Sequence, residues 1–325
     1  MSRRTWAELF VLAALWGVVY LLIAVALRGL PPVLVVFGRV ALGALVLTPL
    51  ALHRGVLQPL VRHPWVVIQV VLVQATVPLL LLTFGQQHIP SSLAGVIVGA
   101  QPLFVALLAT WFARNERPQG WRGVLGIALG IVGLILLFGL DLHTGKEALL
   151  GGGLVLTAAL CYAAGALMIH LRLGDADPLG VAAAAMLVST IALVVPGLLM
   201  LPRRVPSPGT LGALITLGVV CTGMTLALFY KLIAQAGPSR AALAFYLSPA
   251  FAVVFGWIFL HEHIAVTTVL GLGAIVIGSA LAAHRAGARD QSPGRSPGSG
   301  AMASWSYRRA GPRAQGIRGN CAPPS

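Results

Sequence analysis

Long apolar runs separated by short polar connections are the feature that most constrains the fold of this chain. Ten such runs approach the length of about 20 residues that a helix needs to cross a bilayer. They fall near residues 7–27, 32–52, 65–84, 91–113, 120–138, 150–170, 178–200, 209–232, 240–260 and 264–284. The connections carry Gly, Pro or charge, as between Arg28 and Pro32. The sequence therefore predicts an all-α, polytopic membrane protein with ten transmembrane helices.

The composition argues against a water-soluble protein. Of the 325 residues, 58% are hydrophobic and 9% are charged, and the mean hydropathy is +0.91. A soluble domain carries about 25% charged residues, so this chain has too few to cover a surface in water. The net charge of +14 lies mostly in short loops and in a tail from Arg285 onward. This distribution differs from a nucleic-acid-binding surface. We expect the partners to be the lipid bilayer and a small-molecule substrate, and no nucleic acid.

Lys and Arg are divided unevenly between the two sides of the predicted bundle. One side holds ten of them before the tail, and the other side holds four. Because cytoplasmic loops are enriched in Lys and Arg, this bias places both termini in the cytoplasm. We expect a multi-pass protein of the cell membrane. Residues 1–6 and a disordered basic tail, 285–325, would be cytoplasmic, and a linker, 139–149, would lie outside.

The second half of the sequence repeats the first in outline. Gln101-Pro102 recurs as Ser248-Pro249, with the prolines 147 residues apart, and Gly126 recurs as Gly271 after 145 residues. Glu116 recurs as Glu262, and both glutamates fall at predicted helix–loop boundaries. Such a long-period repeat predicts two structurally similar units.

Each of the repeated units, residues 7–138 and 150–284, holds five predicted spans. An odd number of spans forces the second unit to begin on the opposite side of the membrane from the first. The two five-helix repeats are therefore predicted to be inverted, as in many secondary transporters, whose central site lies at the repeat interface.

These motifs, in this order, resemble the drug/metabolite transporter superfamily, in particular its ten-helix EamA-type members. The residues that carry the resemblance are Leu15-Trp16-Gly17, Pro32, Arg39, Ser91, Ala94, Gln101-Pro102, Glu116, Pro178, Ser239-Arg240-Ala241, Ser248-Pro249, Glu262 and Gly271. The resemblance covers roughly residues 7–284. It implies a carrier of small metabolites, such as amino-acid-like compounds or drugs, driven by a proton or substrate gradient.

The two halves are not chemically equivalent. Arg39 has no counterpart in the second half, where the matched segment, 181–185, reads Val-Ala-Ala-Ala-Ala. A cation near the centre of a span costs roughly 2.5–3.5 kcal/mol on insertion scales. Arg39 is therefore either a counter-charge for an anionic substrate group or a structural residue that snorkels or pairs with helix-end carbonyls. Both alternatives remain open at this stage.

Uncharged polar residues in or near the predicted spans complete the candidate substrate site. Such groups need partners in lipid, so we expect them to face the bundle interior. Each could instead bond between helices, and Tyr or Trp could lie at the membrane interface. With Arg39, the candidates are Trp16, Tyr20, Gln74, Gln101, Tyr162, Tyr246 and Ser248.

Motifs of enzymes are not present in the sequence. It has no Gly-x-Ser-x-Gly turn and no phosphate-binding loop, and His261-Glu262-His263 lacks the spacing of a helical zinc site. We expect no catalytic residues, no cofactor and no metal. The leading hypothesis is a secondary transporter, a monomer or homodimer, that exports small organic metabolites by alternating access. The alternatives are a membrane scaffold or sensor and, less favoured, an intramembrane enzyme.

Overall fold

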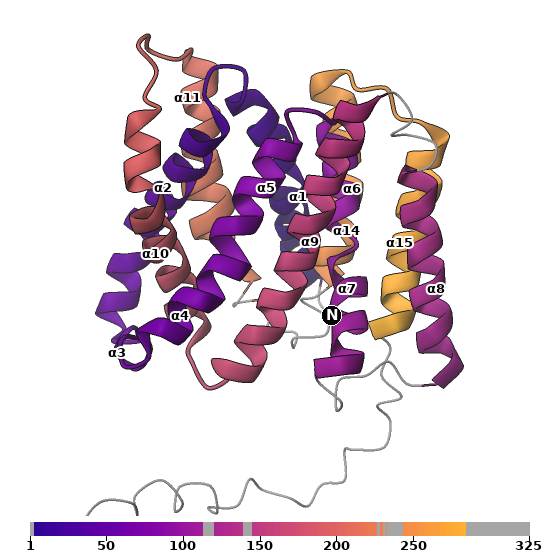
Figure 1. Cartoon of the computed structure of the whole chain (residues 1–325), viewed down its shortest axis with the longest axis horizontal. Helices are drawn as coiled ribbons and strands as arrows, with labels where there is room; N and C mark the ends of the chain where they lie inside the picture. Colours follow the sequence, from indigo (N-terminus) through magenta and orange to yellow (C-terminus); the bar gives the residue numbers. More distant parts are fainter. Residues whose placement is uncertain are drawn as a thin grey trace, which may run out of the picture. The chain divides into compact units, whose positions relative to one another are not determined.

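The computed structural model describes residues 3–112, 120–138, 145–225, 228–229, 232 and 243–283. In these ranges every regular element is a helix, and there is no strand (Figure 1). The predicted all-α fold is therefore confirmed. Glu116, most of the predicted linker 139–149 and the predicted tail 285–325 lie outside the described residues.

The helices follow the order of the predicted apolar runs. The first half contains α1 (Arg3–Ala26), α2 (Pro32–His53), α3 (Gln58–Val61), α4 (Pro64–Val71), η1 (Leu72–Thr76), α5 (Val77–Gly85), α6 (Ser91–Val98), α7 (Gln101–Phe112) and α8 (Gly120–Leu136). The second half contains α9 (Lys146–Arg172), α10 (Pro178–Leu199), α11 (Pro208–Ile215), η4 (Thr216–Met224), α14 (Leu243–Leu260) and α15 (Val266–Ala283).

Seven helical segments of the described chain are long and apolar enough to cross a membrane. They are Arg3–Ala26, Pro32–His53, Pro64–Gly85, Ser91–Phe112, Lys146–Arg172, Pro178–Leu199 and Leu243–Leu260. Three further apolar helices, Trp121–Leu136, Pro208–Met224 and Val266–Ala282, are shorter. Every predicted run thus contains a helix, and the multi-pass architecture is confirmed. The count of ten complete spans stays a prediction.

Proline sets several helix boundaries. It occupies the first position of α2, α4, α10 and α11, where its missing N–H has no intrahelical partner in any case. Pro102 acts differently, because it lies just after the break at Gly99 and Ala100 that divides the fourth predicted span into α6 and α7. Its ring cannot donate to Val98 four residues earlier, which accounts for the break.

The third predicted span of each half contains a π-helical segment, η1 in the first and η4 in the second. Pro32 and Pro178, which begin α2 and α10, are 146 residues apart. With the same spacing of 146 residues, η1, residues 72–76, corresponds to residues 218–222 inside η4. These segments were not predicted from the sequence. Their position matters because π-helical turns are frequent at functional sites.

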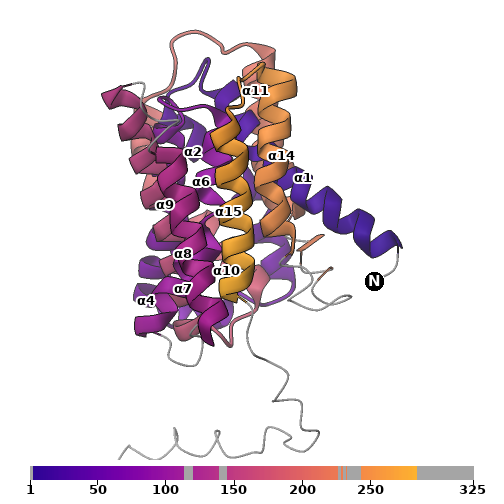
Figure 2. The ribbon, with the colours of Figure 1, turned by 90° about the vertical axis from the view of Figure 1, so that its right-hand side faces the viewer.

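The packing of α8 against α15 establishes the inversion of the two halves (Figures 1 and 2). The backbone of Gly126 meets that of Gly278, and the backbone of Gly133 meets that of Gly271. Gly271 and Gly278 are the sequence equivalents of Gly126 and Gly133. Replacing each glycine by its equivalent in the other half therefore gives the same two contacts. The earlier residue of α8 meets the later residue of α15 and the reverse, so the two helices are antiparallel. Since a two-fold axis relating antiparallel helices is perpendicular to them, the repeats are inverted, as predicted.

The core of the bundle lies between the halves. Helix α1 packs against α14 and α11 of the second half, and its counterpart α9 packs against α5, α6 and α7 of the first. Helix α2 packs against its own counterpart, α10. The largest buried cluster accordingly mixes residues of both halves, such as Ile23, Val35 and Ile97 with Leu217 and Ile275. The first helix of each half is thereby placed beside the opposite half.

Candidate functional site

Arg39 is the centre of the candidate site. It projects from α2, is half-buried, and its Nε donates to Oγ1 of Thr222 on η4 at 3.4 Å. The Thr222 hydroxyl donates to the carbonyl of Leu217 at 3.0 Å, so its oxygen is free to accept from Arg39. Within the described ranges Arg39 forms no ion pair; Arg4 and Glu8 form one at 3.3 Å near the start of α1. A cation thus lies inside the bundle beside a neutral hydroxyl.

Three further polar side chains lie within electrostatic range of Arg39. They are Tyr20 of α1, Tyr162 of α9 and Cys221 of η4. Tyr20 is buried and is also within electrostatic range of Tyr162, so side chains from the first helices of the two halves lie near the same guanidinium. We call Tyr20, Arg39, Tyr162, Cys221 and Thr222 the Arg39 cluster. The structure brings together three predicted site residues, Tyr20, Arg39 and Tyr162, and adds Cys221 and Thr222, which sequence reasoning missed.

The equivalent of Thr222 in the first half has a different partner. Thr76 lies 146 residues before Thr222, and its hydroxyl shares a hydrogen bond of 2.8 Å with that of Ser189 on α10. The equivalent of Ser189 is Gly43 on α2, which lies against the methyl group of Thr222. Gly43 has no hydroxyl that could bond to Thr222, and the guanidinium of Arg39 is the partner of Thr222 instead. Had the halves been compared position by position, this missing hydroxyl would have pointed to Thr222.

Gln74 lies on η1 against α9. A Cβ atom at Gly165 would overlap the Gln74 side chain, so the close approach requires glycine there. Gly165 is one helical turn from Tyr162. The Oε1 atom of Gln74 is buried and has no hydrogen-bond partner among the described residues. An unsatisfied buried acceptor costs about 1–3 kcal/mol, so this oxygen is a candidate contact for a donor group of a solute.

Trp16 and Ser248 lie in the packing of α1 against α14. The Trp16 ring packs at tilted angles against Phe229 and Phe245, with centroid distances of 5.3 Å and 4.4 Å. Ser248 is buried, and its carbonyl oxygen approaches Gly17 of α1. These contacts describe a close helix–helix interface.

Gln101 and Tyr246 are the remaining predicted site residues. Gln101 is half-buried at the first position of α7, and Tyr246 is half-buried on α14. In the part of the chain that the structure describes, no hydrogen bond or electrostatic interaction joins either residue to Arg39. Their role in substrate binding stays a prediction.

Glu262 makes a second polar contact between the halves, on the connection from α14 to α15. Its Oε1 accepts from the backbone N–H and the hydroxyl of Ser91, both at 2.8 Å, and its Oε2 accepts from the N–H of Ser92 at 3.0 Å. The carboxylate thus satisfies free N–H groups at the start of α6, where the helix dipole favours a negative charge. His261, with φ of 54°, makes the left-handed turn after α14. Gly256 leaves room for the carboxylate.

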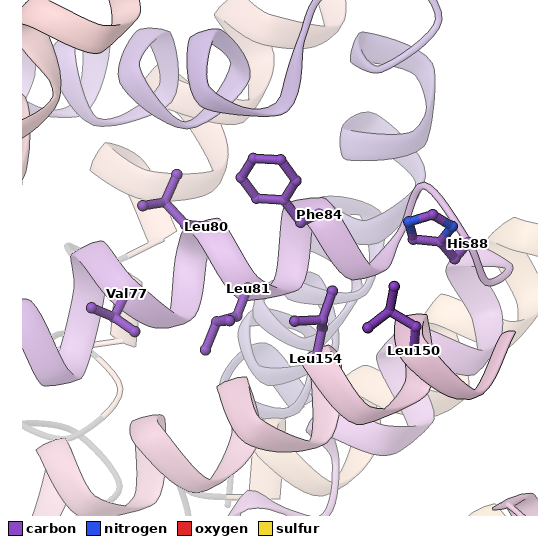
Figure 3. Close-up of a pocket in the computed structure, with 7 residues that line it drawn as sticks. All are labelled: Val77, Leu80, Leu81, Phe84, His88, Leu150 and Leu154. Atoms are coloured by element: carbon purple, nitrogen blue, oxygen red, sulfur yellow. The ribbon is translucent and has the colours of Figure 1, made fainter. Parts of the chain in front are cut away.

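An apolar groove of about 470 Å³ runs between α5 and α9 (Figure 3). It is lined by Val77, Leu80, Leu81, Phe84, His88, Leu150 and Leu154. Val77 and Leu150 are 41% and 55% exposed, so the groove opens at the surface of the bundle. Apart from His88 it offers no polar side chain, so it fits acyl chains better than polar solutes. No three His, Cys, Asp or Glu residues of the described ranges gather into a metal site.

Comparisons with known proteins agree with this architecture. A model of the EamA-like transporter family matches the chain twice, at residues 5–139 and 149–283, so the two halves are homologous. An uncharacterized transporter of Bacillus subtilis, YoaV, is 27% identical over 270 residues, covering 81% of this chain and 91% of YoaV. An uncharacterized inner membrane transporter of Escherichia coli, YedA, is 28% identical over 286 residues, covering 84% of this chain and 88% of YedA.

A solved crystal structure shares the fold. It has a TM-score of 0.62 with 19% sequence identity, and the match covers 87% of this chain and 98% of that one. The family model accounts for both halves of the described bundle, including the helices that carry the Arg39 cluster. The chain is therefore a membrane transporter that belongs to the EamA-like transporter family.

Proposed function

We propose that the protein is a secondary transporter that exports small organic solutes, of the size of amino acids or drugs, by alternating access. The observation that carries the proposal is the Arg39 cluster. It holds a cation, two phenols, a thiol and a hydroxyl where α1, α2, α9 and η4 of the two halves converge. An ionisable group inside a membrane bundle is costly and marks substrate pathways in membrane proteins.

The inverted repeat supports alternating access. Exchange of the two halves produces a second arrangement of the same contacts that faces the opposite side of the membrane. The contact between α8 and α15, made by glycine backbones, lacks interlocking side chains at Gly126 and Gly278. Small residues of this kind allow close helix packing in lipid. The relatives YoaV and YedA are named as transporters, which supports transport, and their names specify no solute.

The orientation belongs to the proposal as well. We place the protein in the cell membrane with both termini in the cytoplasm and the 139–149 linker outside, because of the Lys and Arg bias. A reporter inserted in this linker tests the orientation. An extracytoplasmic signal is the expected result, and a cytoplasmic one contradicts it. The substrate would be a small molecule, with the protein acting as a monomer or homodimer.

Counterflow in proteoliposomes tests the transport function. Purified protein is reconstituted, and uptake of labelled metabolites is measured against an internal pool of the same compound. We expect uptake by the wild type, a loss of about tenfold or more in Arg39→Gln, and near-normal uptake in Arg28→Gln. Arg28 is exposed on the connection between α1 and α2, so it controls for loss of a positive charge. Folded protein that moves no solute would instead favour the scaffold or sensor alternative.

A further inference from the structure

The Arg39 guanidinium has donors to spare. It carries five N–H groups, and the structure pairs its Nε with Thr222 at 3.4 Å, beyond the usual N–H···O range of about 2.7–3.2 Å. No described residue accepts a hydrogen bond from its terminal nitrogens. The fork of the guanidinium, which matches the two oxygens of a carboxylate, is therefore unmatched within the described chain.

The described carboxylates are all engaged elsewhere or lie at the ends of helices. Glu8 pairs with Arg4, Glu262 caps α6, and Asp177 caps α10 by accepting from the N–H of Leu179. Glu147 is exposed in the first turn of α9, and Asp175 lies on the connection after that helix. The charge of Arg39 is thus not neutralised by any carboxylate of the described ranges.

The other members of the Arg39 cluster fit the same interpretation. Tyr20 and Tyr162 carry hydroxyls that can donate to an anion, and none of the cluster residues carries a carboxylate. The second half offers no matching charge, because the equivalent of Arg39 is the buried Ala185. An organic cation at this position would meet repulsion from Arg39 and no counter-charge from the described residues. A small anion would meet a guanidinium fork and phenolic donors.

We infer that the transporter selects solutes that carry a carboxylate or a similar small anionic group, bound by the guanidinium of Arg39, and excludes organic cations. The inference rests on the proposed function and adds the substrate class. Its physical basis is the mutual neutralisation of two charges that are each costly to bury, in a site with few other charges. Arg39 is half-buried, and its terminal nitrogens, which have no hydrogen-bond partner among the described residues, are not fully buried.

Matched ligands that differ in charge alone test the inference. The probes are N-acetyl amino acids, the corresponding N-acetyl amino acid amides, and amines of the same carbon skeleton. Binding is measured on purified full-length protein as a ligand-dependent rise in Tm. We expect carboxylates to raise the Tm of the wild type and of Arg28→Gln, with amides and amines inactive. Arg39→Gln should weaken carboxylate binding by about 10- to 100-fold, the loss expected for a charge-assisted hydrogen bond.

Arg39→Lys provides a second variant that keeps the charge if Arg39→Gln does not yield folded protein. Lysine lacks the planar fork, so we expect weaker carboxylate binding that still exceeds amide binding. The inference is overturned if amides or amines bind as well as carboxylates, if no carboxylate is bound, or if Arg39→Gln retains wild-type affinity. Counterflow separates the two proposals. Charge-selective binding without counterflow contradicts transport alone, and counterflow without charge selectivity contradicts the anion inference alone.

Discussion

Glu262 caps the first residue of α6, Ser91, although the two residues belong to opposite halves of the molecule. Both the N–H and the hydroxyl of Ser91 donate to the same carboxylate oxygen at 2.8 Å. The connection between α14 and α15 is thereby attached to the start of the fourth predicted span. Because the contact joins the two halves, its loss is expected to lower the stability of the bundle.

Replacing Glu262 by Gln tests the strength of this cap. The amide group cannot accept from both Ser91 and Ser92 through two oxygens, so one N–H loses its partner. We expect a loss of about 1–3 kcal/mol in the free energy of unfolding, read as a lower Tm. Glu147→Gln, which removes an exposed carboxylate from the first turn of α9, is the matched control and should leave the Tm nearly unchanged. Equal Tm values for both variants would contradict an energetic role for the cap.

Gly278 tests the glycine contact between α8 and α15. A Cβ atom there would lie 2.6 Å from the carbonyl oxygen of Gly126 and from the N of Gly130, and backbone atoms cannot move aside cheaply. We expect Gly278→Val to lower the Tm sharply or to abolish folded protein. A Cβ atom added at Gly273, on the same helix, would have nothing within 4 Å, so Gly273→Ala should be neutral or slightly stabilising. Comparable yields of both variants would show that the close approach is unnecessary.

A double-mutant cycle measures the hydrogen bond between Thr76 and Ser189. Each single variant, Thr76→Val or Ser189→Ala, leaves one buried hydroxyl without its partner and should cost about 1–3 kcal/mol of stability. The double variant removes both groups, so we expect it to cost less than the sum of the two single changes. The measurement is the Tm of all four proteins. Simple additivity would mean that the two hydroxyls do not interact energetically.

Gln74→Leu separates substrate binding from stability. The change removes a buried oxygen that has no partner among the described residues, so the Tm should stay the same or rise. If this oxygen accepts a hydrogen bond from the solute, counterflow should fall about tenfold at the same time. Gln69→Leu, on α4, is a suitable comparison because Gln69 is exposed and already accepts a hydrogen bond from Arg172. A lower Tm with unchanged counterflow would assign Gln74 a structural role.

The helical architecture and the repeat were predictable because they depend on local and periodic properties. Runs of apolar residues predict helices in lipid wherever they occur, and Pro32 and Pro178 mark equivalent helix starts. The glycines at 126 and 271 showed the duplication, and the odd number of runs in each half predicted the inversion. The π-helical segments η1 and η4 were not predicted, because the period of the apolar residues does not distinguish a π-turn from an α-turn over so few residues.

The candidate site was predicted only in part. A polar residue in a membrane span needs a partner, but the sequence does not show which residue that partner is. Arg39, Tyr20 and Tyr162 lie within electrostatic range of one another, while Trp16 joins an aromatic cluster with Phe229 and Phe245. In the sequence, Trp16, Tyr20, Arg39 and Tyr162 were all candidates for the site. Whether a candidate lies near Arg39 or in another interface depends on which face of its helix packs against which neighbouring helix.

The amino-acid sequence by itself determined a polytopic helical protein made of two inverted copies. The length of the apolar runs and the duplication both follow from the order of residues along the chain and require no knowledge of tertiary contacts. The tertiary structure decided the site. It placed Thr222 against Arg39, 183 residues away, because the inversion packs η4 of one half against α2 of the other. It also left Arg39 without a carboxylate among the described residues, a relation between helices that no local pattern of the sequence encodes.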